Sequence, residues 1–156
     1  MVYLDTSVAV SLLVPEPKTA DVKTWFAGLS ETPVSGDWLL SEFASAISIK
    51  VRSGELAENN AKALRKEFET LTGNGLRIVP VSRAAFRDAA ELAKQHTRRI
   101  RAGDALHLAV AREIGAKSVA TLDSVMSANA ERLNMGVEPI EPTPTSESPV
   151  KRRQLA

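Results

Sequence analysis

The chain has 156 residues, of which 44% are hydrophobic and 25% are charged, a composition that is ordinary for one globular domain. It contains no cysteine, which excludes disulfides, thiolate–zinc sites and a cysteine nucleophile. The net charge is +1, and the segment from Glu141 onward carries it with three basic and two acidic residues. Any nucleic acid would therefore have to be bound by local basic patches.

The start of the chain shows no export signal. Met1 to Asp5 contains no basic region and reaches an acidic residue almost at once. The apolar run from Val8 to Val14 is interrupted by Ser11 and is far shorter than the roughly 20 residues of a membrane span. We therefore expect a cytoplasmic protein without a membrane segment.

The first half of the chain alternates apolar runs with amphipathic segments. The predicted elements are a buried strand at 2–4, helices at 7–13 and 19–29, a weak strand at 33–35, and helices at 38–52 and 58–71. Ser7 and Asp37 are the expected N-caps of the first and third of these helices. The Gly73-Asn74-Gly75 segment is a turn that ends the fourth helix.

The second half continues the alternation. The predicted elements are a strand at 76–81, a helix at 82–96, a basic loop at 97–101, a helix at 103–114, a strand at 118–122, a helix at 124–133 and a short strand at 137–140. Pro80 cannot donate to a sheet hydrogen bond, so it favours an edge strand or a strand end. Ser82 is the expected N-cap of its helix, and Gly115 is the expected residue directly after the helix at 103–114.

This order of elements predicts the fold class and the domain boundary. Strands that alternate with helices indicate an α/β fold, an α/β/α sandwich on a short, mainly parallel sheet. The strand at 2–4 should lie centrally, because its residues are all apolar. Residues 1–140 form one domain, and the proline-rich polar segment 141–156 is predicted to be a disordered tail.

Four carboxylates, Asp5, Glu42, Asp104 and Asp123, each stand where a predicted strand ends or a predicted helix begins. In an open α/β sheet both kinds of position face the edge formed by the carboxyl ends of the strands, where ligands bind. Like charges gathered there repel one another, so the cluster needs protons or a cation. Carboxylate oxygens are the ligands that a hard divalent cation prefers, which predicts a metal site.

Each acid also has a purely structural interpretation. Asp5 and Asp123 could cap the helices that follow them, and Asp104 could complement the dipole at the start of its helix. Glu42 could be a rim residue that reaches solvent. Gly103 would allow backbone or a ligand to approach closely, which favours a functional interpretation of Asp104.

Other polar residues near these acids have two interpretations each. Arg98, Arg99 and Arg101 precede the Asp104 helix and could bind phosphates, or they could form a solvated loop. His107 lies one turn after Asp104, and in a helix of Ala and Leu it is more often a core histidine with satisfied hydrogen bonds. His96 is well separated from the acids and has no serine close to it in the sequence, so a Ser-His-Asp triad has little support.

Taken together, four segments resemble the PIN-domain family, and specifically the bacterial VapC toxins of type II toxin–antitoxin systems. They are Val2-Tyr3-Leu4-Asp5-Thr6-Ser7, Ser41-Glu42-Phe43-Ala44-Ser45-Ala46, Gly103-Asp104-Ala105-Leu106-His107-Leu108-Ala109 and Thr121-Leu122-Asp123. Their order, spacing and secondary-structure context match the family from the first strand to about Ile140, and the ordered set is more specific than any one segment.

The resemblance implies a ribonuclease that depends on Mg²⁺ or Mn²⁺ and hydrolyses RNA phosphodiester bonds. Asp5 and Asp104 would be the core metal ligands, Glu42 and Asp123 would complete the catalytic acids, and Thr6 and Ser7 would orient Asp5. The family also implies a homodimer and a small antitoxin protein that blocks the site.

Three other readings fit less well. A haloacid-dehalogenase-like phosphatase needs a second acid two residues after Asp5, where Ser7 stands. A receiver domain needs an aspartate after its third strand, where the sequence reads Val79-Pro80-Val81-Ser82. A catalytically silent PIN-like module that binds RNA or protein remains the alternative, although the presence of all four acids argues against it.

Overall fold

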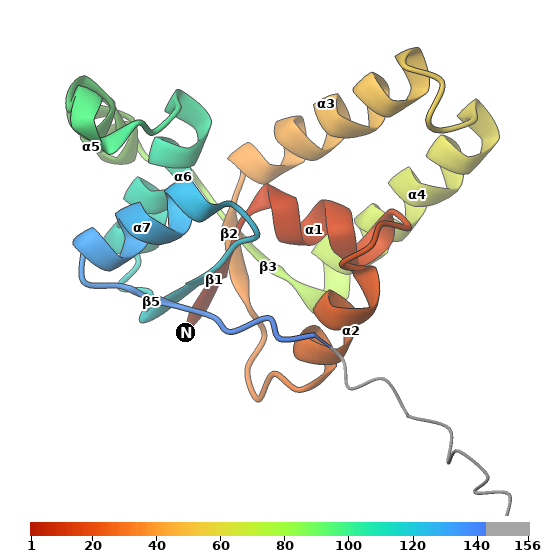
Figure 1. Cartoon of the computed structure of the whole chain (residues 1–156), viewed down its shortest axis with the longest axis horizontal. Coiled ribbons are helices and arrows are strands. Elements are labelled where there is room, and N and C mark those ends of the chain that lie inside the picture. The colour runs from red at the N-terminus through yellow and green to blue at the C-terminus, as the bar shows by residue number, and fades with distance from the viewer. Residues whose placement is uncertain (143–156) are drawn as a thin grey trace, which may run out of the picture.

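Residues 1–142 are described by the structure, a computed structural model. They form the predicted α/β/α fold on a five-stranded sheet (Figure 1). Residues 141 and 142 have no regular structure, and the rest of the predicted disordered tail lies outside the described residues.

All strand pairs in the sheet are parallel, and the strand order is β3-β2-β1-β4-β5. The strands are β1 (Val2–Leu4), β2 (Val34–Gly36), β3 (Arg77–Val79), β4 (Ser118–Ala120) and β5 (Gly136–Val137). The central position predicted for β1 is confirmed. Pro80 follows directly after the edge strand β3, as its missing N–H requires.

Seven α-helices lie within the described part of the chain. They are α1 (Thr6–Leu13), α2 (Thr19–Ala27), α3 (Trp38–Arg52), α4 (Glu58–Thr70), α5 (Arg83–Lys94), α6 (Ala102–Glu113) and α7 (Ser124–Arg132). None of the helices within residues 1–142 is long and apolar enough to cross a membrane. A short 3-10 helix at His96–Arg98 occupies part of the predicted basic loop.

The helices form two layers, one on each face of the sheet (Figure 1). Side chains alternate along β1, so Tyr3 packs into the core under α5, α6 and α7, whereas Leu4 packs into the core under α1, α3 and α4. Val119 and Ala120 of β4 divide between the two cores in the same way. Asp5 follows directly after Leu4, at the carboxyl end of the central strand.

Among the residues considered as helix N-caps, Asp5, Ser82 and Asp123 cap their helices, Asp37 stands at the N-cap position without a cap bond, and Ser7 is wrong. Asp5, not Ser7, caps α1 by accepting a hydrogen bond from the Val8 N–H. Asp37 precedes α3 but makes no cap hydrogen bond, because its backbone is already helical (φ −51°, ψ −25°). The predicted caps at Ser82 and Asp123 are confirmed, with bonds from the N–H groups of Ala85 and Met126.

Glycine positions give one confirmation and one correction. Gly115 directly follows the C-cap of α6 with φ +70°, the left-handed conformation expected there. The predicted turn at Gly73-Asn74-Gly75 instead lies in a π-helical turn, Leu71–Gly75, that extends α4. The Thr72 hydroxyl donates to the Phe68 and Glu69 carbonyl groups and so helps to continue the helix.

Candidate active site

Asp5 is the most firmly held of the four acids. Its side chain is buried, with Oδ1 accepting from the Ser7 hydroxyl at 2.6 Å and from the Val8 N–H at 3.2 Å. Its Oδ2 accepts from the Thr121 hydroxyl at 2.6 Å. Burial raises the pKa of Asp5, while the hydroxyl groups of Ser7 and Thr121 lower it. The carboxylate therefore has a fixed orientation set by groups from α1 and from the end of β4.

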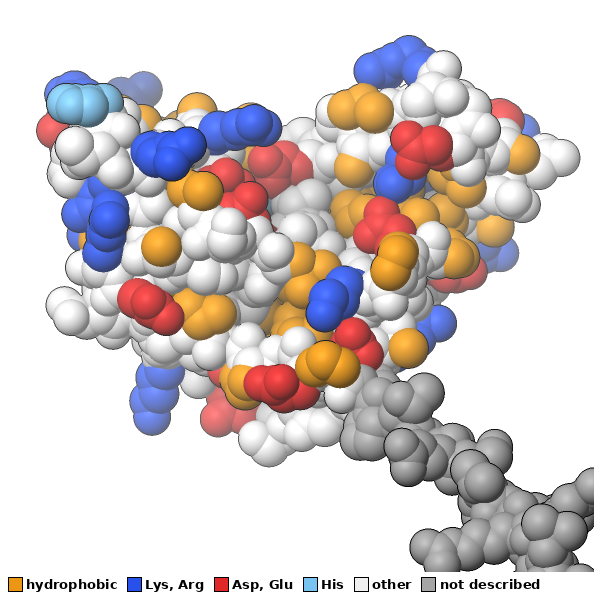
Figure 2. Space-filling view, in the orientation of Figure 1, with side chains coloured by type: hydrophobic (Ala, Val, Ile, Leu, Met, Phe, Trp, Pro, Cys, Tyr) orange, Lys and Arg blue, Asp and Glu red, His pale blue; other side chains and the backbone are white. Residues whose placement is uncertain are grey.

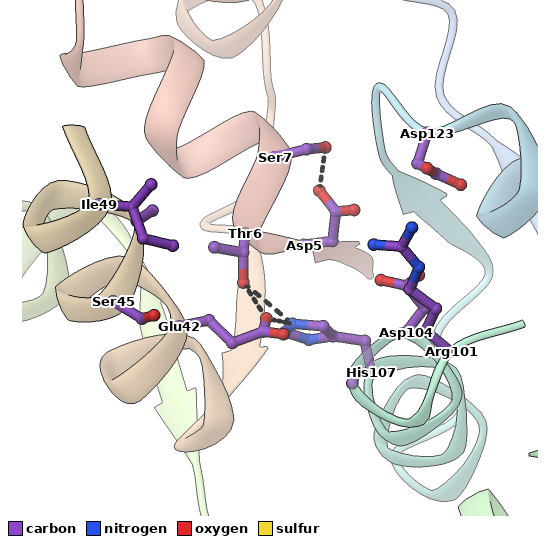
Figure 3. Close-up of a pocket in the computed structure, with 12 residues that line it drawn as sticks. Asp5, Thr6, Ser7, Glu42, Ser45, Ile49, Arg101, Asp104, His107 and Asp123 are labelled. Carbon is purple, nitrogen blue, oxygen red and sulfur yellow. Dashed lines mark hydrogen bonds and ion pairs between the residues drawn. The ribbon is translucent and has the colours of Figure 1, made fainter. Parts of the chain in front are cut away.

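Asp104 and Asp123 line the same pocket as Asp5, from the start of α6 and the start of α7 (Figure 3). Asp123 Oδ1 accepts from the Met126 N–H at 2.7 Å, so this residue is both a helix cap and a pocket residue. Burial raises the pKa of Asp104, and the negative charges of Asp123 and Asp5 raise it further. The three carboxylates thus act electrostatically on one another, as the sequence predicts.

Glu42 reaches the pocket from α3, on the opposite wall. Its Oε2 accepts a hydrogen bond from the Thr6 hydroxyl and lies 2.6 Å from His107 Nε2. Burial alone would raise the pKa of Glu42, but the hydrogen bonds from His107 and Thr6 outweigh it and lower this pKa. Ser7 contacts Asp5 as expected, whereas Thr6, also expected to orient Asp5, bonds to Glu42 instead.

His107 is a core histidine with satisfied hydrogen bonds, as expected, and the structure adds contacts of His107 with pocket residues and with Tyr3 that the sequence did not predict. His107 is 1% exposed and contacts Glu42, Thr6 and the Tyr3 hydroxyl. The signal in the sequence was the position of His107 one turn after Asp104, which places both side chains on one face of α6. No comparable signal marked Tyr3, because a tyrosine in a central strand reads as an ordinary core residue.

The pocket has a volume of about 430 Å³ and lies between the α3 wall and the α6–α7 wall. Figure 2 shows it as a hollow on the upper side of the molecule, with acidic side chains inside and basic side chains along one rim. The lining residues are Asp5, Thr6, Ser7, Glu42, Ser45, Ala46, Ile49, Arg101, Gly103, Asp104, His107 and Asp123. All four predicted acids are therefore brought together.

The three arginines predicted to bind phosphate have different positions. Arg101 lines the pocket and is exposed (Figure 3). Arg98 is directed elsewhere: it donates to Gln95 at 2.6 Å and to the buried Asn129 of α7 at 3.3 Å. Arg99 is exposed and has a left-handed backbone with φ +54°. Of these three, Arg101 is the one that can face a ligand in the pocket.

The donor atoms suit a hard divalent cation, although they are not drawn together around one point. Within residues 1–142, no three Asp, Glu or His side chains lie in an arrangement that would hold a metal ion. The acids nevertheless offer only oxygen donors, and their mutual repulsion raises the pKa of Asp104. A cation would remove this repulsion. Asp5, Asp104 and Asp123 line the pocket with carboxylate oxygens, which are the kind of ligand that such an ion prefers.

The raised pKa of Asp104 predicts a pH-dependent effect on stability. Ionised Asp104 is disfavoured in the folded protein, so its charge lowers stability above the ordinary aspartate pKa of about 3.9. In metal-free buffer at neutral pH, Asp104→Asn should raise the Tm by about 2–4 °C, a small gain because the group is half exposed. The gain should vanish as the pH falls through about 4, where aspartate becomes neutral in both states.

Thermal melts of both chains across this pH range check the prediction. Glu67→Gln, which removes an exposed carboxylate on α4, is the matched control and should change little at any pH. A stabilisation by Asp104→Asn that is independent of pH would contradict the electrostatic interpretation.

Comparison with known proteins agrees with this geometry. A family model described as PIN domain matches residues 2–132. The FitAcB structure from Neisseria gonorrhoeae is 23% identical with a TM-score of 0.69, and the match covers 90% of this chain and 98% of that one. VapC20 from Mycobacterium tuberculosis, described as a sarcin–ricin loop cleaving toxin, is 20% identical with a TM-score of 0.67, covering 83% and 95%.

A further solved structure, VapBC2 from Rickettsia felis bound to a DNA fragment from its promoter, is 16% identical with a TM-score of 0.60. That match covers 88% of this chain and 98% of the other. At these identities the similarity establishes a shared fold. A search of curated proteins found no significant match.

Proposed function

The chain belongs to the PIN-domain family, and from that premise we propose that it is a Mg²⁺- or Mn²⁺-dependent endoribonuclease, the toxin of a type II toxin–antitoxin system. The observation that carries the proposal is the meeting of Asp5, Glu42, Asp104 and Asp123 in one pocket at the carboxyl edge of a parallel sheet. VapC20, which shares the fold, is described as a sarcin–ricin loop cleaving toxin, and this supports the choice of substrate.

The proposed ion would be held by Asp5 and Asp104, with Asp123 close by. When bound, it supplies charge neutralisation for the phosphodiester and activation of water for in-line attack. Asp5 contributes a carboxylate that is fixed before any ligand arrives, because its hydrogen bonds to Ser7, Val8 and Thr121 hold both oxygens. Asp104 contributes a negative charge that destabilises the folded protein until a cation neutralises it.

Glu42 and Arg101 have different tasks in this proposal. The lowered pKa of Glu42 keeps it ionised at neutral pH, so it can accept a hydrogen bond from water in the pocket and orient that water. Arg101 places a permanent positive charge at the rim, where its guanidinium can hold a phosphate of the RNA in the geometry typical of such pairs. In this proposal Glu42 orients the water and Arg101 orients the RNA.

The proposed biological setting follows the family and the fold. We propose a cytoplasmic homodimer that a small antitoxin protein silences. Two structures that share this fold are named as the FitAB and VapBC2 complexes, each bound to DNA, which supports an antitoxin partner.

The catalytically silent binding module remains the second candidate, favoured by the separation of the metal donors within residues 1–142. Cleavage of RNA that requires a metal distinguishes the two.

The first prediction from this proposal concerns Asp104. Asp104→Asn keeps the size of the side chain but removes a negative ligand, so RNA cleavage in Mn²⁺ should fall by several orders of magnitude. Induction of the variant should also no longer stop growth. Purified protein, RNA and Mn²⁺, with and without EDTA, provide the measurement, and Glu67→Gln serves as the control with full activity. Cleavage that survives EDTA, or full activity in Asp104→Asn, would refute the metal-dependent nuclease.

The second prediction separates two neighbouring arginines. Arg101→Ala should weaken RNA binding and reduce the slope of log affinity against log salt concentration by about 1, as expected for one lost phosphate contact. Arg98→Ala removes the same charge at a position that bonds to Gln95 and Asn129, so its salt slope should stay near wild type. Fluorescence anisotropy with labelled RNA in metal-free buffer measures both. Equal slopes for the two variants would show that Arg101 makes no specific contact.

A further inference from the structure

A buried chain of hydrogen bonds runs behind the pocket and ends on Glu42. The Gly36 N–H donates to the Tyr3 hydroxyl at 3.2 Å, and this hydroxyl lies 2.8 Å from His107 Nδ1. On the other side of the imidazole, Nε2 lies 2.6 Å from Glu42 Oε2. Figure 3 shows the last part of this chain, where His107, Thr6 and Glu42 converge. The chain therefore links β2, β1 and α6 to the acid on α3.

The chemistry of these groups assigns the protons. An ionised Glu42 can only accept, so His107 Nε2 carries the hydrogen of that bond. Nδ1 of the neutral ring is then an acceptor, and the Tyr3 O–H donates to it. The Tyr3 oxygen in turn accepts from Gly36. The Ser35 hydroxyl is close enough to lower the pKa of Tyr3 but forms no hydrogen bond among residues 1–142. His107 Nε2 also lies 3.0 Å from the Thr6 hydroxyl oxygen, but its shorter contact is with Glu42 Oε2.

Burial gives this arrangement its rigidity. Tyr3 and His107 are 0% and 1% exposed, and their rings meet edge to face with centroids 5.7 Å apart. No solvent competes for the hydroxyl or the imidazole at such burial. A buried hydroxyl without a hydrogen-bond partner lowers stability, so phenylalanine at position 3 would be more stable than tyrosine if the hydroxyl made no hydrogen bond. The Tyr3 hydroxyl instead points at the residue that contacts a pocket acid.

Two further neighbours restrict the Glu42 carboxylate, which otherwise faces the pocket. The Thr6 hydroxyl donates to the same Oε2 that accepts from His107. On the far side, a methyl group at Gly103 would come within 2.5 Å of Glu42 Oε1, so α6 leaves room for the carboxylate only because residue 103 is glycine. The group that lies close to Gly103 is thus the Glu42 side chain, which the sequence did not predict. The carboxylate has one position that satisfies all these contacts.

We propose that Tyr3 and His107 are positioning residues, which fix the Glu42 carboxylate in the pocket through this hydrogen-bond chain with His107 in its Nε2–H tautomer. The inference deepens the proposed nuclease function and rests on it for its catalytic consequence. The arrangement of protons itself is a property of the folded protein, and it can be tested without RNA or metal.

The direct test is the protonation pattern of the His107 ring, read from long-range ¹H–¹⁵N correlation spectra of metal-free protein. Nε2 should be protonated and Nδ1 bare. The other histidine, His96, is exposed and provides the internal reference. In Tyr3→Phe the His107 signals should shift, because Nδ1 loses its donor. A His107 ring with the proton on Nδ1, or a spectrum unaffected by Tyr3→Phe, would overturn the proposal.

A double-mutant cycle tests whether Tyr3 acts through Glu42. Tyr3→Phe should lower kcat for RNA cleavage roughly tenfold with little change in KM, the size expected for one lost hydrogen bond. In a Glu42→Gln background the same substitution should change kcat by less than about twofold. Ser11→Ala removes a buried α1 hydroxyl that has no hydrogen-bond partner among residues 1–142; it is the control and should leave kcat unchanged. Fully multiplicative losses would show that Tyr3 has only a structural role.

The two measurements separate this inference from the proposed function. If wild-type protein cleaves no RNA with either metal, the nuclease proposal fails, and the spectra still decide whether Tyr3 and His107 hold Glu42. If cleavage is robust but the His107 tautomer or the cycle disagrees, the positioning role fails and the nuclease proposal stands.

Discussion

The structure is organised around the burial of one carboxylate, Asp5, at the end of the central strand. A buried carboxylate is stable only when its oxygens have hydrogen-bond donors. The donors come from the first turn of α1 and from Thr121 at the end of β4, and the Asp5 N–H itself donates to the Ala120 carbonyl at 3.1 Å. This requirement ties β1, β4 and α1 together at one point.

Tyr3, Leu4 and Asp5 are consecutive residues of β1 and its carboxyl end, and each has a different place around the site. Tyr3 faces the core under α6 and reaches His107, and Leu4 faces the opposite core under α1 and α3. Asp5 leaves the sheet at its carboxyl edge and enters the pocket. The alternation of side chains along β1 therefore connects both helical layers to the same cluster of acids. The price is electrostatic repulsion among Asp5, Asp104 and Asp123, which a cation would relieve.

Much of this arrangement could be predicted from the sequence, because it follows from local patterns. The apolar β1, the helical repeat of α3, the caps at Ser82 and Asp123, and the left-handed Gly115 are all encoded within a few neighbouring residues. The convergence of the acids was also predictable, since parallel strands end at one edge. The family resemblance supported the same set of residues.

The remaining features depend on contacts between distant residues. Asp5 displaced Ser7 as the cap of α1 because the Ser7 hydroxyl turns back to the carboxylate and also accepts from the Leu122 N–H. Thr6 bonds to Glu42, 36 residues away, and Tyr3 bonds to His107, 104 residues away. Arg98 looks equivalent to Arg101 in the sequence, but Asn129 of α7 draws it away from the pocket. No local pattern contains this information.

The central claim is that the acids at this edge form a binding site for one kind of ligand, a divalent cation. Anomalous diffraction from a crystal soaked in Mn²⁺ tests it most directly, because the signal locates the ion without any assumption about activity. The account predicts an anomalous peak in contact with Asp5 and Asp104, with Asp123 turned toward it, and loss of that peak in crystals of Asp104→Asn. A soaked crystal with no peak in this pocket, or a peak that persists unchanged in Asp104→Asn, would contradict the account.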